Sequence, residues 1–352
     1  MLHFLARRIR YSLLVLWGVV SLVFFLFNVL PGDPARLTLG QRSDLNSLAN
    51  VRRDLNLDKP LFTRYLFYIN DLLPIGLHNR DSATAQRYHY LVLFPVSTEK
   101  CIALKWPYLG RSYRTKREVN AVLTDALPGT AILALTAMSF ATIAGILLGI
   151  LAALKKGSWL DTSAITASVA GISLPSFVAA LFIAYLFGYL LHSYTGLNMT
   201  GSLWEYDAFT GRHLAIRNLI LPAFALGIRP LAIITQLTRS SMLDVLNQDY
   251  IRTACAKGLS KTKVVFRHAL PNALNPVVTT VSGWLAELLA GSFFVEYIFG
   301  WKGVGKITVD ALDKFDFPLV MGSVLLTAFI FIIVNLFTDL LYSWLDPRVR
   351  IH

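Results

Sequence analysis

A glycine-rich stretch near residue 300 comes close to a phosphate-binding loop. Gly300, Gly305 and Lys306 have the spacing of that motif, whose backbone N–H groups cradle nucleotide phosphates. The motif also needs Ser or Thr directly after the lysine to hold magnesium, and Ile307 fills that place. An apolar segment rather than a strand comes before the stretch. We therefore predict that it binds no nucleotide.

Glu287 lies in the middle of an apolar segment, Val277–Ile298. A carboxylate in lipid is costly, so we expect it to face the interior of a helix bundle or a water-filled cavity. Two interpretations stay open. Glu287 either lines a path for solute across the membrane, or it has a structural role in which it is protonated or hydrogen-bonded to a neighbouring helix.

The other reactive side chains show no spacing typical of a catalytic or metal site. The seven histidines are scattered without an HExxH motif, and none lies deep in an apolar segment. Cys101 and Cys255 form no CxxC pair, and the predicted topology places them on opposite sides of the membrane. We predict no metal site, no cofactor and no catalytic residue.

A polar, basic stretch between two apolar segments has the pattern of a helix at a membrane surface. A short helix is predicted there, capped by Asn247 or Asp249 and ended by Gly258 in the left-handed conformation. A second helical segment is expected over Ser260–Ala269, and Pro271 should break it and redirect the chain into the membrane. Such a helix suits docking of a soluble partner, although an ordinary basic cytosolic loop is the alternative.

The composition shows that the chain needs a lipid bilayer as its solvent. Of its 352 residues, 55% are hydrophobic and 15% are charged, whereas soluble domains have roughly 25% charged residues. The net charge of +12 would suit nucleic-acid binding, but no basic patch lies on a soluble module of its own. Positive charge on the cytosolic loops of a membrane protein explains it better, and we predict no nucleic-acid partner.

Six segments are long and apolar enough to span a membrane, which takes about 20 residues. The first is longer than the apolar core of a signal peptide and lacks a small-residue cleavage site, so we expect it to stay uncleaved. Interruptions are expected at Pro175 and at Pro230. The predicted spans are Ile9–Leu30, Leu127–Leu154, Ile165–Leu191, Leu219–Leu237, Val277–Ile298 and Leu319–Trp344.

Lys and Arg in the short loops set the orientation. Four basic groups fall on one side of a six-span topology, so both termini are predicted to be cytosolic. Within the long external loop, Leu61–Leu73 has a helical apolar pattern, and His89–Lys105 predicts a short strand or a loop. The predicted divisions are a first helix (1–30), an external loop (31–126), a core of five spans (127–344) with a cytosolic loop (239–276), and a tail (345–352).

The residues of the cytosolic loop follow a known spacing: Arg-Thr-Ala, three residues, Gly, nine residues, His-Ala-Leu-Pro. This resembles the Glu-Ala-Ala motif in permease subunits of ATP-binding-cassette importers. Arg-Thr-Ala in place of Glu-Ala-Ala is similar to the version in the dipeptide, oligopeptide and nickel permease B family. The matching positions are Arg252, Thr253, Ala254, Gly258, Leu270 and Pro271, and the supporting stretches are Leu30–Pro34, Leu57–Leu61, Leu127–Thr130 and Asp346–Arg348.

The resemblance implies an all-α polytopic fold with six transmembrane helices and a sizeable external loop, in the inner membrane of a bacterium. It implies a transmembrane subunit that imports di- or oligopeptides by alternating access, with nickel as a second choice of substrate. The implied partners are two cytosolic ATP-binding subunits, a second related permease and an external substrate-binding protein. The first loop helix would dock in a groove of an ATPase, with Thr253, Ala254 and Ala256 permitting close approach.

Two other classes of protein remain as alternatives. An ion- or proton-coupled carrier would need a relay of ionisable residues inside the membrane, and Glu287 is the one central candidate. An intramembrane enzyme would need a nucleophile and a base within the spans, and none is found there. The residues therefore favour an ATP-driven permease whose ATP hydrolysis takes place on separate subunits. Residues 77–107 lie outside the resemblance, and the sequence assigns them no role.

Overall fold

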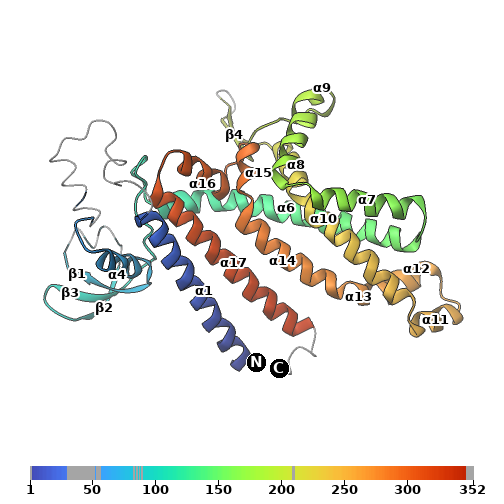
Figure 1. Ribbon diagram of the computed structural model, residues 1–352, viewed down its shortest axis with the longest axis horizontal. Helices are drawn as coiled ribbons and strands as arrows, with labels where there is room; N and C mark the ends of the chain where they lie inside the picture. Colours follow the sequence, from blue (N-terminus) through green and yellow to red (C-terminus); the bar gives the residue numbers. More distant parts are fainter. Residues whose placement is uncertain are drawn as a thin grey trace. The chain divides into compact units, whose positions relative to one another are not determined.

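Helices make up most of the chain in the computed structural model, which describes residues 2–29, 52, 57–81, 84, 86, 88, 90–207 and 211–345 (Figure 1). The chain forms two compact units. One unit consists of residues 9–125 and 310–328. The other consists of residues 126–309 together with residues 1–8 and 329–352.

Four described helices are long and apolar enough to cross a membrane, and each contains one predicted span. Pro222 and Pro230 both lie inside one of them, so the interruption expected at Pro230 is wrong. Both prolines are buried. Each removes one backbone hydrogen bond, and the packing of the helix face on which they lie outweighs that loss. The four helices are α1 (Leu2–Val29), α6 (Val119–Leu154), α10 (Arg217–Leu246) and α17 (Phe317–Leu345).

The third predicted span is sharply bent, and the interruption expected at Pro175 is confirmed. Helix α7 (Trp159–Ser173) ends just before Leu174 and Pro175, and α8 (Ser176–Ile183) continues into the π-helix η1 (Ala184–Leu190). The two arms meet at 107°. Proline restricts its preceding residue to extended backbone, which explains why the helix stops at this point. If the two arms of this bent pair are counted together as one span, the described residues contain five candidate spans.

The fifth predicted span is not one continuous helix. It is divided at Ser292 into α14 (Asn275–Gly291) and α15 (Phe293–Ile298). Helix α14 has 17 residues, fewer than the roughly 20 that a straight span needs. The other elements of this unit are α9 (His192–Thr195), β4 (Trp204–Asp207), β5 (Gly211–Leu214), α11 (Asp249–Ala256), α12 (Lys261–Lys263), η2 (Val264–Ala269), α13 (Leu270–Ala273) and, in its first part, α16 (Val304–Asp313).

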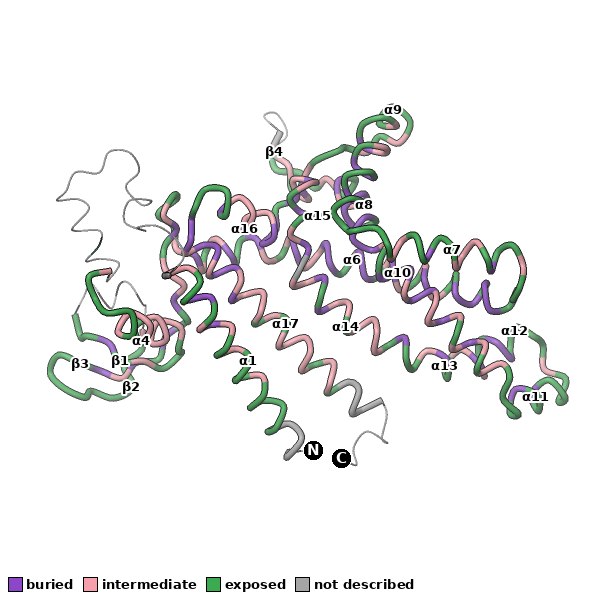
Figure 2. Tube along the Cα trace, in the orientation of Figure 1, coloured by how far each residue is buried: buried purple, intermediate pink, exposed green. Residues whose placement is uncertain are grey.

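The core of the larger unit lies where α6 packs against α10 and α14. Buried residues concentrate along α6 and α10 (Figure 2). A Cβ atom at Gly145 would lie 2.8 Å from the side chain of Ile234, and one at Gly149 would lie 2.5 Å from Thr238. Small residues four apart let two membrane helices approach closely, so dispersion contacts can hold them where lipid gives no hydrophobic driving force.

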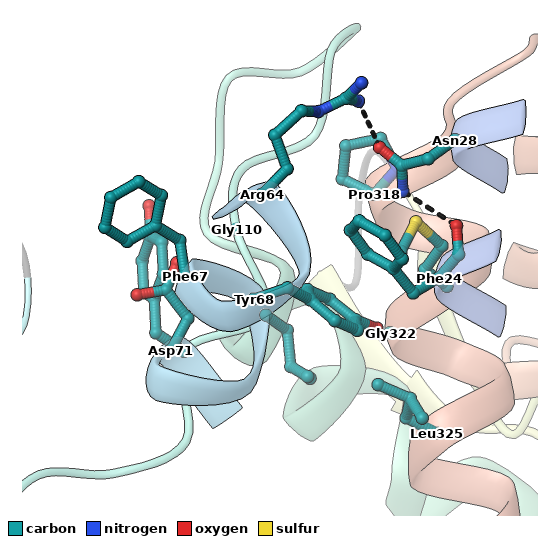
Figure 3. Close-up of a pocket in the computed structure, with 13 residues that line it drawn as sticks. Phe24, Asn28, Arg64, Phe67, Tyr68, Asp71, Gly110, Pro318, Gly322 and Leu325 are labelled. Atoms are coloured by element: carbon teal, nitrogen blue, oxygen red, sulfur yellow. Dashed lines mark hydrogen bonds between the residues drawn. The ribbon is translucent and has the colours of Figure 1, made fainter. Parts of the chain in front are cut away.

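In the other unit, the predicted external helix is confirmed as α4 (Leu61–Leu72), and it packs on α1. The hydroxyl of Tyr65 lies 2.6 Å from that of Ser21, and its ring contacts Phe24 at 5.2 Å between centroids. Arg64 donates a hydrogen bond to Asn28. Phe24, Asn28 and Arg64 line a cavity of about 190 Å³ (Figure 3).

Three strands between Ile75 and Leu104 form a small antiparallel sheet with the order β1-β3-β2. The strand predicted within His89–Lys105 is confirmed by two strands joined by a short turn. Every residue of β2 is exposed, whereas β3 buries alternate side chains. The strands are β1 (Ile75–Asn79), β2 (Leu91–Pro95) and β3 (Lys100–Leu104).

His78 on β1 lies buried between two tyrosine rings, with centroids at 4.5 Å for Tyr88 and 5.8 Å for Tyr90. Its Nε2 atom has no hydrogen-bond partner among the described residues. Burial, and then the nearby charge of Lys105, lower the pKa of His78 from 6.5 to about 4. The folded sheet therefore holds this imidazole neutral.

We expect this unit to lose stability as the pH falls from about 6.5 to about 4. In that window the unfolded chain binds a proton at His78 and the folded chain does not, whereas above it both forms are neutral. The loss should be about 1–2 kcal/mol after solvent screening. Urea unfolding of the purified full-length protein at both pH values measures it. His78→Phe should flatten this part of the profile, and an unchanged profile would contradict the assignment.

Candidate functional site

Helix α11 (Asp249–Ala256) carries the first three residues of the predicted motif. It begins at Asp249, and the residue before it, Gln248, is in extended backbone without a side-chain cap. The capping expected of Asn247 or Asp249 is therefore wrong: Asn247 donates to the carbonyl of Leu243, and Asp249 contacts Arg252 at 3.3 Å. Asp249 still favours the helix start because a carboxylate there opposes the positive end of the dipole.

The end of α11 follows the prediction. Gly258 has φ +75°, the left-handed conformation in which a side chain is costly. The N–H of Gly258 donates to Cys255 O at 2.9 Å, and the N–H of Leu259 donates to Ala254 O at 3.4 Å. These two bonds form a Schellman motif, and Leu259 packs against the buried apolar cluster that contains Ala254. The chain thus turns sharply after about two turns of the helix.

One face of α11 is buried in its own chain. Ile251 and Ala254 belong to what we call the loop cluster, so the expectation that Ala254 faces a partner is wrong. The cluster consists of Ile150, Ala153, Met242, Ile251, Ala254, Val264, Val265, Ala269 and Ala273. The opposite face of α11 is an exposed stripe at helical spacing, formed by Asp249, Arg252, Thr253 and Ala256.

The second predicted helical segment is present, but Pro271 does not break it. The chain runs through α12, η2 and α13 into α14 with a single turn residue at Leu274. The π-helical turn lies directly before α13, in which Pro271 occupies the first turn, where its missing N–H costs least. Leu270 is half-buried against the loop cluster and Pro271 is exposed.

The loop cluster joins the exposed stripe to two long helices. Ile150 and Ala153 belong to the last turns of α6, and Met242 belongs to the last turns of α10. The side chain of Asn272 also donates to the Tyr250 hydroxyl at 3.1 Å, which ties α13 to α11. Close packing transmits displacement, so a force on α11 would move the neighbouring ends of α6 and α10.

An ion pair that the sequence did not predict lies near this region. Asp161 is 3% exposed and accepts two hydrogen bonds from Arg239, at 2.5 and 2.8 Å. The N–H of Gly157 donates to the same carboxylate at 2.9 Å. The pair fastens α7 to α10. The sequence did offer one signal for this pair: Asp161 and Arg239 have opposite charges and lie in segments predicted on the same side of the membrane.

We expect Asp161→Ala to lower the melting temperature of the protein by several degrees, because it leaves the guanidinium of Arg239 without its partner. The double variant Asp161→Ala with Arg239→Met should be more stable than Asp161→Ala alone. Thermal unfolding of the detergent-solubilised protein measures both. Strictly additive losses would show that the two side chains do not interact.

Of the two surroundings expected for Glu287, the interior of its own bundle is excluded, and a water-filled cavity stays a prediction. It is exposed on α14, on the same face as Pro276 and Gly283. Its carboxylate has no hydrogen bond or ion pair among the residues that the structure describes. An unpartnered carboxylate on an apolar helix is costly in lipid, so this face suits contact with a second protein or with water.

The glycine loop, Gly300–Lys306, joins α15 to α16. A helix precedes it, not the strand that a phosphate-binding loop requires. Among the described residues no group of three His, Cys, Asp or Glu side chains could hold a metal ion.

Comparison with known proteins decides the family. Residues 145–351 match the family described as "Binding-protein-dependent transport system inner membrane component", and residues 1–86 match its N-terminal family. The chain belongs to this family of inner-membrane permeases.

The full length of the chain is similar to curated permeases. It is 38% identical over 365 residues to the di/tripeptide transport system permease protein DppB of Pseudomonas aeruginosa, with 99% of each chain covered. It is 35% identical over 371 residues to the dipeptide transport system permease protein DppB of Escherichia coli K12, again with 99% of each covered. The DppB of Alkalihalophilus pseudofirmus is 34% identical over 364 residues, covering 99% of this chain and all of that one.

Membership of the permease family fixes the class of protein. The chain is the multi-pass membrane component of a binding-protein-dependent ATP-binding-cassette importer, a system that includes an ATPase and a substrate-binding protein. It is a mostly helical membrane protein without a catalytic domain. Two of the sequence stretches that resemble the family, Leu30–Pro34 and Asp346–Arg348, and the predicted tail lie outside the described residues.

Proposed function

We propose that this permease imports di- or oligopeptides across the cytoplasmic membrane, with both of its termini in the cytosol. The substrate class is supported by the relatives, whose names assign dipeptides or di- and tripeptides to proteins that match nearly the full chain. A second related permease would complete the path, and two ATPases would drive it.

The observation that carries the mechanism is the exposed stripe of α11, held rigidly on the loop cluster. Asp249, Arg252, Thr253 and Ala256 would enter a groove of one ATPase. When ATP closes two ATPases, each would pull one such helix. Because the loop cluster joins α11 to α6 and α10, that movement would tilt these helices and change access to the path.

The open face of α14 would line the path. Glu287 lies there without a partner among the residues that the structure describes, together with the half-buried Thr280 and the exposed Gly283. A carboxylate can form a charge-assisted hydrogen bond with the ammonium group at the amino end of a peptide. The division into an external loop at 31–126 and a permease core at 127–344, with its cytosolic loop at 239–276, stays a prediction.

Uptake of a labelled dipeptide by cells that carry or lack the gene tests this function. Uptake should depend on the gene, be inhibited by unlabelled dipeptide, and be unaffected by nickel ions. It should fall when ATP is depleted and survive a protonophore while ATP is maintained. Loss of uptake with the protonophore alone would support the ion-coupled alternative, and gene-dependent nickel uptake would replace peptide as the substrate.

A further inference from the structure

The glycine loop folds around a carboxylate of its own chain. Glu296 on α15 is 0% exposed. Its Oε1 atom accepts a hydrogen bond from the hydroxyl of Ser292 at 2.6 Å, and its Oε2 accepts one from the N–H of Lys306 at 3.1 Å. The hydroxyl of Thr130 and the N–H of Gly305 also bond to this carboxylate. The loop therefore uses backbone N–H groups to hold an anion, as a phosphate loop does, but the anion is Glu296.

All the groups around the carboxylate act as donors. The oxygen of Thr130 already accepts the N–H of Val304 at 2.8 Å, so its single hydroxyl proton is available for Glu296. Backbone N–H groups can only donate. An ionised carboxylate satisfies such a set, because it accepts through both oxygens. A side-chain amide satisfies it less well, because it is neutral and accepts through one oxygen only, so the charge-assisted hydrogen bonds are lost.

The glycines allow this close packing. A Cβ atom at Gly303 would lie 2.3 Å from Oε2 of Glu296, and one at Gly129 would lie 2.0 Å from the carbonyl oxygen of Lys302. Both distances are shorter than real Cβ contacts, so a side chain at Gly303 would displace the carboxylate of Glu296, and one at Gly129 would displace the backbone of Lys302. The Nε1 atom of Trp301 also donates to Gly129 O at 2.9 Å, and Trp301 is 1% exposed.

We propose that Glu296 is a positioning residue for transport. Its carboxylate fastens α15 and the start of α16 to the Thr130 end of α6, so that these segments move as one body. Helix α14 ends one residue before α15, so its open face, which carries Glu287, is positioned through the same joint. We call the attachment of α15 and α16 to α6 through the Glu296 carboxylate the anion joint. Its expected effect on uptake rests on the proposed function, whereas the joint itself does not.

The test compares Glu296→Gln with Glu296→Ala in the complete transporter, reconstituted with its partners in liposomes. Both should assemble, and both should lower peptide uptake about tenfold. Glutamine has nearly the same shape as glutamate, so a packing role alone predicts normal uptake for Glu296→Gln. Added formate should occupy the vacated anion site and restore uptake to Glu296→Ala but not to Glu296→Gln. Chloride at the same concentration should not.

A second pair of variants covers the case in which the Glu296 variants fail to fold. Thr130→Val removes the donated hydroxyl and keeps the shape, and Thr130→Ser restores the hydroxyl, so the valine variant should lose uptake and the serine variant should keep it. Glu118→Gln, at a half-exposed ion pair with Arg111, is the matched control and should behave like the wild type.

Thermal unfolding separates this inference from the proposed function. If the wild type imports no peptide, the proposed substrate is wrong, but formate should still raise the melting temperature of Glu296→Ala. Two results would overturn the anion joint. One is a Glu296→Gln variant with the uptake rate and melting temperature of the wild type, and the other is a Glu296→Ala variant whose uptake and melting temperature do not respond to formate.

Discussion

Replacing Gly258 with valine is expected to abolish the association of the ATPase with this permease while the chain still inserts into the membrane. A β-branched residue at φ +75° is disfavoured by more than about 1–2 kcal/mol. The backbone would leave this conformation, and the bonds to Cys255 O and Ala254 O that end α11 would be lost. Co-purification of the ATPase with tagged permease measures the effect.

Gly258→Asn is the matched control, because asparagine tolerates the left-handed conformation. It should retain most of the association. A Cβ atom at this position would meet nothing within 4 Å, so steric conflict inside the chain does not explain a difference between the two variants. If Gly258→Val co-purifies as much ATPase as the wild type does, α11 is not the docking element. Equal loss in both variants would show that bulk rather than backbone conformation matters.

Glu287→Gln is expected to lower the uptake of peptides with a free amino terminus about tenfold, with normal assembly and ATP hydrolysis. The carboxylate is exposed on α14 and has no partner among the described residues, so it is available to a substrate. Loss of a hydrogen bond between two charged groups costs about 1.5–3 kcal/mol, and tenfold corresponds to about 1.4 kcal/mol. Initial uptake rates over a range of peptide concentrations measure it.

Two controls separate a substrate contact from a structural role of Glu287. Glu287→Asp keeps the charge and should recover part of the uptake. A peptide with an acetylated amino terminus lacks the ammonium group, so its slow uptake should be the same in the wild type and in Glu287→Gln. Unaltered uptake of free peptides by Glu287→Gln at normal expression would place this residue outside the path.

Local signals predicted the elements of the site well. Gly258 ends α11 where expected, because the left-handed conformation is a property of a single residue. Helix α4 and the bend at Pro175 also follow from patterns within a few residues. The errors have a different origin. Pro230 and Pro271 were expected to break helices, but Pro230 is buried in a packed face and Pro271 lies in a first helical turn.

The side chains that fasten the site were harder to predict. Asp161 and Arg239 are 78 residues apart, and Thr130 and Val304 are 174 residues apart, so no periodicity in the sequence connects either pair. The glycine loop resembled a phosphate site because its backbone does hold an anion, but the anion comes from the preceding helix. Glu296 lies between apolar neighbours and close to the end of a predicted span, where nothing distinguished it from a boundary residue.

The sequence by itself determined the membrane class, most of the apolar helices, the basic loop and its motif, because hydrophobic length and backbone preference act along the chain. Only the tertiary structure decided which face of α11 is open, that the Glu287 side chain is exposed on α14, and that Glu296 fills the glycine loop. Those properties depend on which distant segments pack together and on which polar groups they leave to be satisfied.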